Sequence, residues 1–88
     1  MSQPTQDQTN EHLREILIRA RNAAGLTQAR LAERLRRPQS FVSKYERGER
    51  RLDIVEFIEV ASALGIDPAS VVADLVGPSA RTKLTTRQ

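Results

Sequence analysis

The chain has no cysteine and very few aromatic residues or histidines. Its 88 residues include no cysteine or tryptophan, two phenylalanines, one tyrosine and one histidine, His12. Without thiols there is neither a disulfide framework nor a thiolate metal site, so packing must hold the core and a reducing cytoplasm is the expected compartment. One histidine cannot form a histidine-based metal cluster within the chain. We expect no metal site and no cofactor.

Long apolar runs are missing too. No segment approaches the roughly 20 apolar residues that a bilayer-spanning helix requires. The start of the chain, MSQPTQDQTN, lacks the apolar middle of a signal peptide. We therefore expect a soluble protein with no membrane contact. A chain of 88 residues fits one small domain, because domains usually hold about 50 to 200 residues.

Signatures of catalysis are also lacking. The chain has no glycine-rich phosphate loop and no Gly-x-Ser-x-Gly. His12 is expected to be an exposed residue in the first turn of a helix. Glu56 and Glu59 share a helix face, but an acidic face of this kind is usually solvated. We expect no catalytic residue and no enzyme.

Positive charge is concentrated in one stretch. The chain carries a net charge of +3, and the segment between Arg30 and Arg51 contains eight basic residues against three acidic ones. The rest of the chain is therefore net negative. Such asymmetry is typical of a surface that binds a polyanion. A charged, solvated face is the alternative, and charge alone does not decide between the two.

Apolar residues at helical spacing predict an all-α fold of five short helices. The first is expected to have Asn10 as its N-cap and to end at Gly25. The second is expected to start at Thr27 and to end before Pro38, because the residue preceding a proline avoids the helical region. The predicted inner face of the second helix consists of Ala29, Leu31, Ala32 and Leu35.

The third and fourth helices have clear boundaries. The third is expected at about Gln39 to Arg47, followed by Gly48. Asp53 and Glu56 have the spacing of a capping box, which predicts the start of the fourth helix, and Gly65 its end. The predicted inner face of the fourth helix consists of Val55, Ile58, Ala61 and Leu64, or their neighbours.

The fifth helix also has clear predicted boundaries. Asp67 is its expected cap, and Gly77 its expected end. The stretches TQARLAERL, QSFVSKYERG and ASALG resemble the helix-turn-helix DNA-binding domain of Cro and the phage repressors, the Xre family. The resemblance covers roughly Leu13 to Leu75. It implies a five-helix, lambda-repressor-like domain whose third helix enters the major groove of double-stranded DNA.

The expected organisation of the chain combines this resemblance with the composition of the two ends, a start rich in Gln, Thr and Pro and an end without a sustained period. Residues 1–9 are expected to be a disordered tail, residues 10–76 the helix-turn-helix DNA-binding domain, and residues 77–88 a mobile basic tail.

Base contacts are the first group of site residues that the resemblance implies. They are expected from Gln39, Ser40, Ser43 and Lys44. The amide of Gln39 suits adenine, because it can donate to N7 and accept from the exocyclic amine, and Lys44 suits the acceptors of guanine. For each of these residues the alternative is an ordinary exposed side chain.

Phosphate contacts form the second group. Gln28, in the first turn of the second helix, resembles the family's phosphate-binding glutamine. Further phosphate contacts are expected from Arg36, Arg37, Arg47, Arg50 and Arg51. They would contribute affinity and salt dependence rather than sequence preference, and some would simply be solvated.

Other positions are expected to shape the scaffold. Arg21 and Glu46 match positions that form a structural ion pair in the family. Phe41 either packs beneath the turn or touches a thymine methyl group or sugar, and packing is favoured. The family usually has glycine where this chain has Arg36, a position that often needs a left-handed backbone. Pro38 replaces the usual serine or threonine cap and cannot cap through its side chain.

The expected function is sequence-specific regulation of transcription, as a homodimeric repressor that reads an inverted repeat. Two-fold pairing doubles the limited readout of one half-site. The family tends to pair through its last helix, where the interface candidates are Val71, Val72, Leu75 and Val76. Alternatively, these residues only close the core of the monomer. A second hypothesis is an antitoxin-like or adaptor subunit whose main partner is another protein. RNA binding is disfavoured, because three aromatic residues provide no stacking platform.

Overall fold

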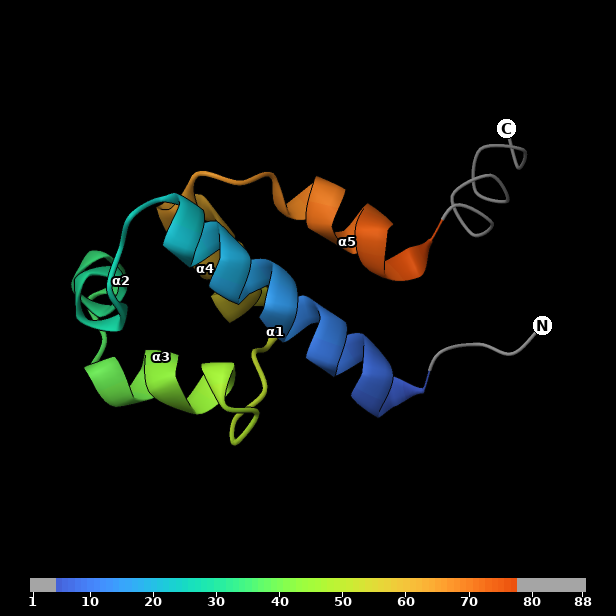
Figure 1. The fold of residues 1–88 in the computed structure, drawn as a ribbon, viewed down its shortest axis with the longest axis horizontal. Helices are drawn as coiled ribbons and strands as arrows, with labels where there is room; N and C mark the ends of the chain where they lie inside the picture. Colours follow the sequence, from blue (N-terminus) through green and yellow to red (C-terminus); the bar gives the residue numbers. More distant parts are fainter. Residues whose placement is uncertain (1–4, 78–88) are drawn as a thin grey trace.

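Five helices make up the fold in the computed structural model, which describes residues 5–77. They are α1 (Gln6–Ala23), α2 (Gln28–Leu35), α3 (Gln39–Glu46), α4 (Ile54–Leu64) and α5 (Pro68–Val76). The long helix α1 runs through the middle of the molecule and contacts α3, α4 and α5, while α2 packs on α3 and α4 (Figure 1). Within residues 5–77 there is no strand, and the predicted all-α fold of five helices is confirmed. Most of the two predicted tails, residues 1–4 and 78–88, lies outside the described residues.

The start of α1 differs from the prediction. Thr5 is the N-cap, and it forms a capping box with Gln8 through hydrogen bonds of 2.9 and 3.1 Å. The prediction of Asn10 as the cap was wrong: Asn10 lies inside the helix and donates to the carbonyl of Gln6. Both residue types are good caps, but Thr5 has a glutamine three residues later, so this pair satisfies two free amides. Residues 5–9 therefore belong to the cap and first turns of α1 rather than to a disordered tail.

The other predicted helix starts are confirmed. Thr27 accepts a hydrogen bond of 3.1 Å from the amide of Arg30. Asp53 caps α4 at 2.8 Å, and Asp67 caps α5 at 3.0 Å. These side chains satisfy amides that have no partner within their helices. The predicted stop glycines all have positive φ: Gly25, Gly48, Gly65 and Gly77.

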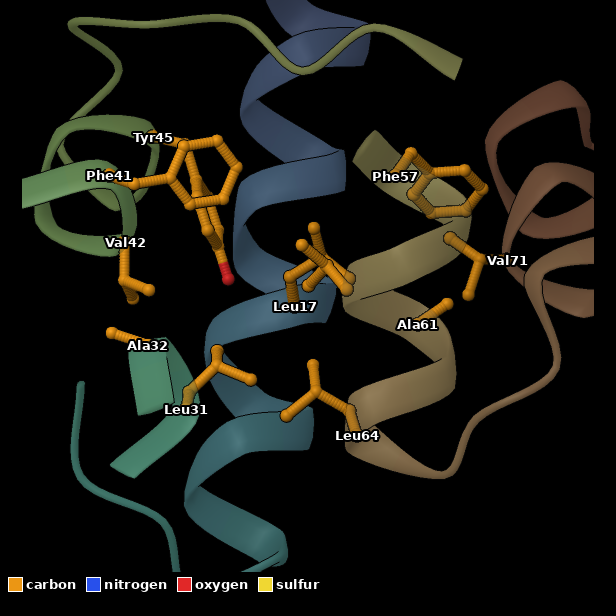
Figure 2. Packing of buried hydrophobic residues seen from close by; sticks show 11 residues of the cluster. Leu17, Leu31, Ala32, Phe41, Val42, Tyr45, Phe57, Ala61, Leu64 and Val71 are labelled. Atoms are coloured by element: carbon orange, nitrogen blue, oxygen red, sulfur yellow. The ribbon is translucent and has the colours of Figure 1, made fainter. Parts of the chain in front are cut away.

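Side chains from all five helices form a single core (Figure 2). Leu17 of α1 lies at its centre with no exposed surface. The other buried apolar residues are Leu31, Ala32, Phe41, Val42, Tyr45, Phe57, Val60, Ala61, Leu64 and Val71. Because this core joins α3 to α1 and α2, the outer side of α3 has a fixed direction in the molecule.

Two predicted inner faces need correction. On α4, Val55 and Ile58 are 60% and 47% exposed, whereas Phe57 and Val60 are buried. The helix is apolar on both sides, so the spacing of its apolar residues did not select the buried side. On α2, Ala29 is exposed, whereas Leu31 and Ala32 are buried.

Candidate nucleic-acid interface

The helix α3 has one buried side and one exposed side. Its apolar residues Phe41, Val42 and Tyr45 are buried. The residues predicted to contact bases lie away from them: Gln39, Ser40 and Lys44 are exposed, and Ser43 is partly exposed. The structure thus brings all four predicted side chains onto one side of a helix whose opposite side is anchored in the core.

The turn between α2 and α3 contains an unusual backbone conformation. Arg36 has φ 56° and ψ 43°, and it is the one non-glycine residue with positive φ between residues 5 and 77. The backbone amide of Arg36 donates to the carbonyl of Glu33, and the backbone amide of Arg37 donates to the carbonyl of Ala32. Pro38 follows in an extended conformation and makes no side-chain cap. The left-handed residue lets the chain leave α2 and enter α3 within three residues.

The end of α3 is tied to α1 by an ion pair. The guanidinium of Arg21 donates to both carboxylate oxygens of Glu46, at 2.8 and 3.1 Å, and to the carbonyl of Leu26 at 2.8 Å. The side chains of Arg21 and Glu46 are 13% and 5% exposed. The hydrogen bond to Glu46 raises the pKa of Arg21. Gln28 also donates to Glu46, at 2.8 Å, so in the free protein its amide nitrogen contacts a carboxylate.

A second cluster of charges lies beside Phe41, in the first turn of α3. Arg50 donates to the two carboxylate oxygens of Glu56 at 2.7 and 2.9 Å, and a guanidinium nitrogen of Arg37 lies 3.7 Å from the same carboxylate. Arg37 also donates to Glu59 at 3.3 Å. Both guanidinium groups lie against the ring of Phe41, at 4.6 Å for Arg37 and 4.8 Å for Arg50.

The burial of Glu56 differs from the prediction of a solvated acidic face. Its capping-box bond with Asp53 was expected, but it is 8% exposed rather than solvated. The guanidinium of Arg50, followed by the amide of Asp53, holds the pKa of Glu56 at about 2. Its arginine partners are six and nineteen residues away in the chain, and no local sequence pattern indicates them.

The remaining predicted phosphate contacts are exposed arginines. Arg47 pairs with Glu49 at 2.9 Å, and Arg51 lies 3.8 Å from Asp7. Arg36 is exposed and has no ion pair among residues 5–77. Exposed pairs of this kind contribute little to stability because water screens them, so a phosphate can readily replace the carboxylate.

Comparisons with known proteins agree with this geometry. A family model described as helix-turn-helix matches residues 17–71. A solved structure, an XRE-family like protein from Pseudomonas syringae pv. tomato str. DC3000, is 48% identical over 78% of this chain and 84% of that chain, with a TM-score of 0.76. The chain belongs to the Xre-type helix-turn-helix family. Membership of this family indicates a DNA-binding regulator of transcription.

A second solved structure has the same fold as this Xre domain. It is a hypothetical transcription factor, NHTF, from Neisseria, with 25% identity over 97% of this chain and 92% of that chain and a TM-score of 0.69. No curated protein matches the chain. None of the helices between residues 5 and 77 is long and apolar enough to cross a membrane. Nor do those residues hold a group of three or more acidic, histidine or cysteine side chains that could bind a metal ion.

The Xre domain also has exposed apolar side chains on its last two helices. Of the predicted interface residues, Val72 and Val76 are 42% and 46% exposed, Leu75 is partly buried, and Val71 belongs to the core. Neighbouring α4 exposes further apolar residues, Ile54, Val55 and Ile58. A groove of about 200 Å³ between α1, α4 and α5 has both Ile54 and Val72 in its lining. The apolar surface therefore extends from α5 onto α4.

Proposed function

We propose that the protein is a sequence-specific repressor that binds double-stranded DNA as a homodimer and reads an inverted repeat through α3. The observation that carries this proposal is the exposed polar side of α3. A helix of this kind fits the major groove when its other side is held by the protein core. Here Val42 and Tyr45 anchor α3, and Gln39 and Lys44 are free to reach base edges.

The four polar residues of α3 have different roles in this proposal. Gln39 reads adenine through paired donor and acceptor contacts, and Lys44 donates to guanine. Ser40 and Ser43 bond to a base or a phosphate. The hydroxyl of Ser43 donates to the carbonyl of Ser40 at 3.3 Å in the free protein, and this exposed bond is weak enough to be exchanged for a DNA contact.

Phosphates provide most of the affinity. The exposed residues Arg36, Arg47 and Arg51 flank α3 and exchange weak surface pairs, or water, for phosphate oxygens. Arg37 and Arg50 are more firmly held by Glu56 and contribute less. Gln28 contacts a phosphate with the part of its amide that Glu46 does not use, and the nearby free amides of α2 assist it.

The surface of α5 supports the proposed dimer. Val72 and Val76 are exposed, and Val72 lines the groove between α1, α4 and α5, so a second copy could cover both side chains. A two-fold dimer presents two copies of α3 to successive major grooves, which accounts for an inverted repeat.

The deciding experiment is selection of binding sites from a random duplex pool, followed by affinity measurements on the enriched site. Gln39→Ala and Lys44→Ala are each expected to relax the preference at one defined base, with a loss of about 1 to 3 kcal/mol in discrimination. Arg19→Ala is the matched control for Lys44→Ala. Arg19 is exposed on α1, on the opposite side of that helix from the buried Leu17, and its loss changes the net charge by the same amount as the loss of Lys44.

The outcomes separate a reader of sequence from a general polyanion binder. An enriched inverted repeat, with a preference that both α3 variants relax and Arg19→Ala retains, supports the proposal. If no motif is enriched and all duplexes bind equally weakly with the same salt dependence, the proposal fails.

A second candidate function is that of an antitoxin-like or adaptor subunit with a protein partner. The observation in its favour is that α4 also exposes apolar residues, Ile54, Val55 and Ile58, which the predicted interface of α5 does not include. Sedimentation of the purified protein separates the two. A monomer at all concentrations favours a different partner for this surface, whereas a stable dimer favours the repressor.

A further inference from the structure

One buried carboxylate holds the chain on both sides of α3. Arg37 lies in the turn before α3, and Arg50 lies in the loop after it. Glu56 of α4 accepts two hydrogen bonds from Arg50 and lies 3.7 Å from Arg37. Since Glu56 is only 8% exposed, this charge is well shielded from water, and losing it would leave both arginines without their shared partner.

Phe41 is the part of α3 that the two arginines contact. It lies in the first turn of the helix, directly after Gln39 and Ser40, and is 7% exposed. Each guanidinium group lies within 5 Å of its ring centre, at 4.6 and 4.8 Å, a distance at which the cation attracts the ring. The first turn of α3 has no side-chain cap, because Pro38 cannot supply one. The contacts of Phe41 are therefore a principal restraint on this turn.

We propose that Glu56 is a positioning residue for DNA recognition. By holding Arg37 and Arg50 against Phe41, it fixes the direction in which Gln39 and Ser40 point. It also limits the binding of phosphates by these two arginines, whose side chains are 34% and 39% exposed. Glu56 thus raises the preference for the correct site over other DNA. This inference rests on the proposed function and extends it to a residue that does not touch DNA.

The substitution Glu56→Gln tests this role while preserving the helix cap. Glutamine still accepts the hydrogen bond from the amide of Asp53, but it no longer carries the charge that holds the arginines. We expect the ratio of affinities for the selected site and for random duplex to fall about tenfold, the order of one lost base contact. The salt dependence of binding to random duplex should become steeper, by about 0.9 in the logarithmic slope for each arginine that joins a phosphate.

Two other variants test whether the effect of Glu56→Gln comes from the contacts of Glu56 and not from the change in net charge. Glu15→Gln makes the same change in net charge on the exposed side of α1, where Glu15 has no ion pair among residues 5–77, and should leave the affinity ratio as in the parent. Phe41→Leu removes the ring but leaves Glu56 to hold the arginines. It should lower the ratio without changing the salt slope on random duplex. This variant also tests the inference if Glu56→Gln fails to fold.

The outcomes distinguish this inference from the proposed function. If the parent selects a site and Glu56→Gln matches Glu15→Gln in both ratio and slope, with only its melting temperature lowered, Glu56 is a stabilising residue and the inference is overturned. An unchanged ratio for Phe41→Leu overturns it as well. If the parent binds no duplex, the proposed function fails, and this inference fails because it depends on that function.

Discussion

Arg21 and Glu46 join α1 to the end of α3 through two hydrogen bonds, at 2.8 and 3.1 Å. The carboxylate is 5% exposed, so it depends on its partners for the solvation that water would otherwise supply. Removing one member of such a pair leaves an uncompensated charge, which costs more than the pair itself contributes.

Arg21→Met is therefore expected to lower the free energy of unfolding by about 3 kcal/mol. Glu46 would retain only the hydrogen bond from Gln28. Urea unfolding followed by far-ultraviolet circular dichroism measures the change. Arg19→Met, on the exposed side of the same helix, should stay within about 0.5 kcal/mol of the parent. Equal stability for the two variants would contradict the structural role of the pair.

Arg36→Gly should increase stability. A residue with a side chain at φ 56° has an energetic cost of about 1 kcal/mol that glycine avoids. Arg36→Ala is the matched variant, because it removes the same charge but keeps the strain. We expect glycine alone to raise the midpoint of chemical unfolding, and both variants to weaken DNA binding equally if Arg36 contacts a phosphate. A higher midpoint for alanine as well would show that charge repulsion, and not backbone strain, destabilises this turn.

Apart from the N-cap of α1, the helix boundaries that local sequence determines were predicted well. Thr27, Asp53 and the glycines that end the helices act on backbone groups within a few residues, so their types and spacing were sufficient. The buried side of α4 was not predicted, because Val55 and Val60 are both apolar and only packing against other helices distinguishes them.

In the candidate site, too, local features could be predicted and contacts between distant parts of the chain could not. An exposed polar side of α3 could be predicted from its spacing and from the family resemblance. The partners of the charged residues could not, because long side chains pair across the fold and not along the chain. Thus Arg50, predicted to contact phosphate, is held by Glu56 in the free protein, and Gln28 donates to Glu46.

Tyr45→Phe is expected to raise the free energy of unfolding by about 1 kcal/mol. The hydroxyl of Tyr45 is the buried side-chain polar group without a hydrogen-bond partner among residues 5–77, and the residue is 1% exposed. Thermal and urea unfolding of the two proteins measure the difference. A loss of stability would show instead that the hydroxyl binds a buried water molecule, whose hydrogen bonds the substitution removes.

The ultraviolet titration of Tyr45 gives an independent measurement. It is the single tyrosine of the chain, so its spectrum needs no assignment. Burial raises the pKa of Tyr45 well above its usual 10. We expect phenolate to form only together with alkaline unfolding, and its appearance in the folded protein near pH 10 would contradict the burial of this ring.

Acid stability should depend on Glu56. Hydrogen bonds from Arg50 and Asp53 lower its pKa from 4.5 to about 2. A lowered pKa in the folded state means that the contribution of Glu56 is fully present above pH 4.5 and is lost as the pH falls towards 2. Melting temperatures across this range should fall less steeply for Glu56→Gln than for the parent, whereas Glu15→Gln should follow the parent. Parallel curves for all three proteins would contradict the charge–charge contact.

Val76→Asp tests the proposed dimer surface without changing any residue of α3. Val76 is 46% exposed at the end of α5, so an acidic residue there is tolerated in a monomer. At a two-fold interface the same change would bury two carboxylates near each other, a desolvation that weakens the dimer strongly. Sedimentation should then show monomers, and affinity should fall for the inverted repeat but remain nearly unchanged for a single half-site. If the variant remains dimeric with parental affinity for the repeat, the interface lies elsewhere, and the exposed apolar residues of α4 become the next surface to substitute.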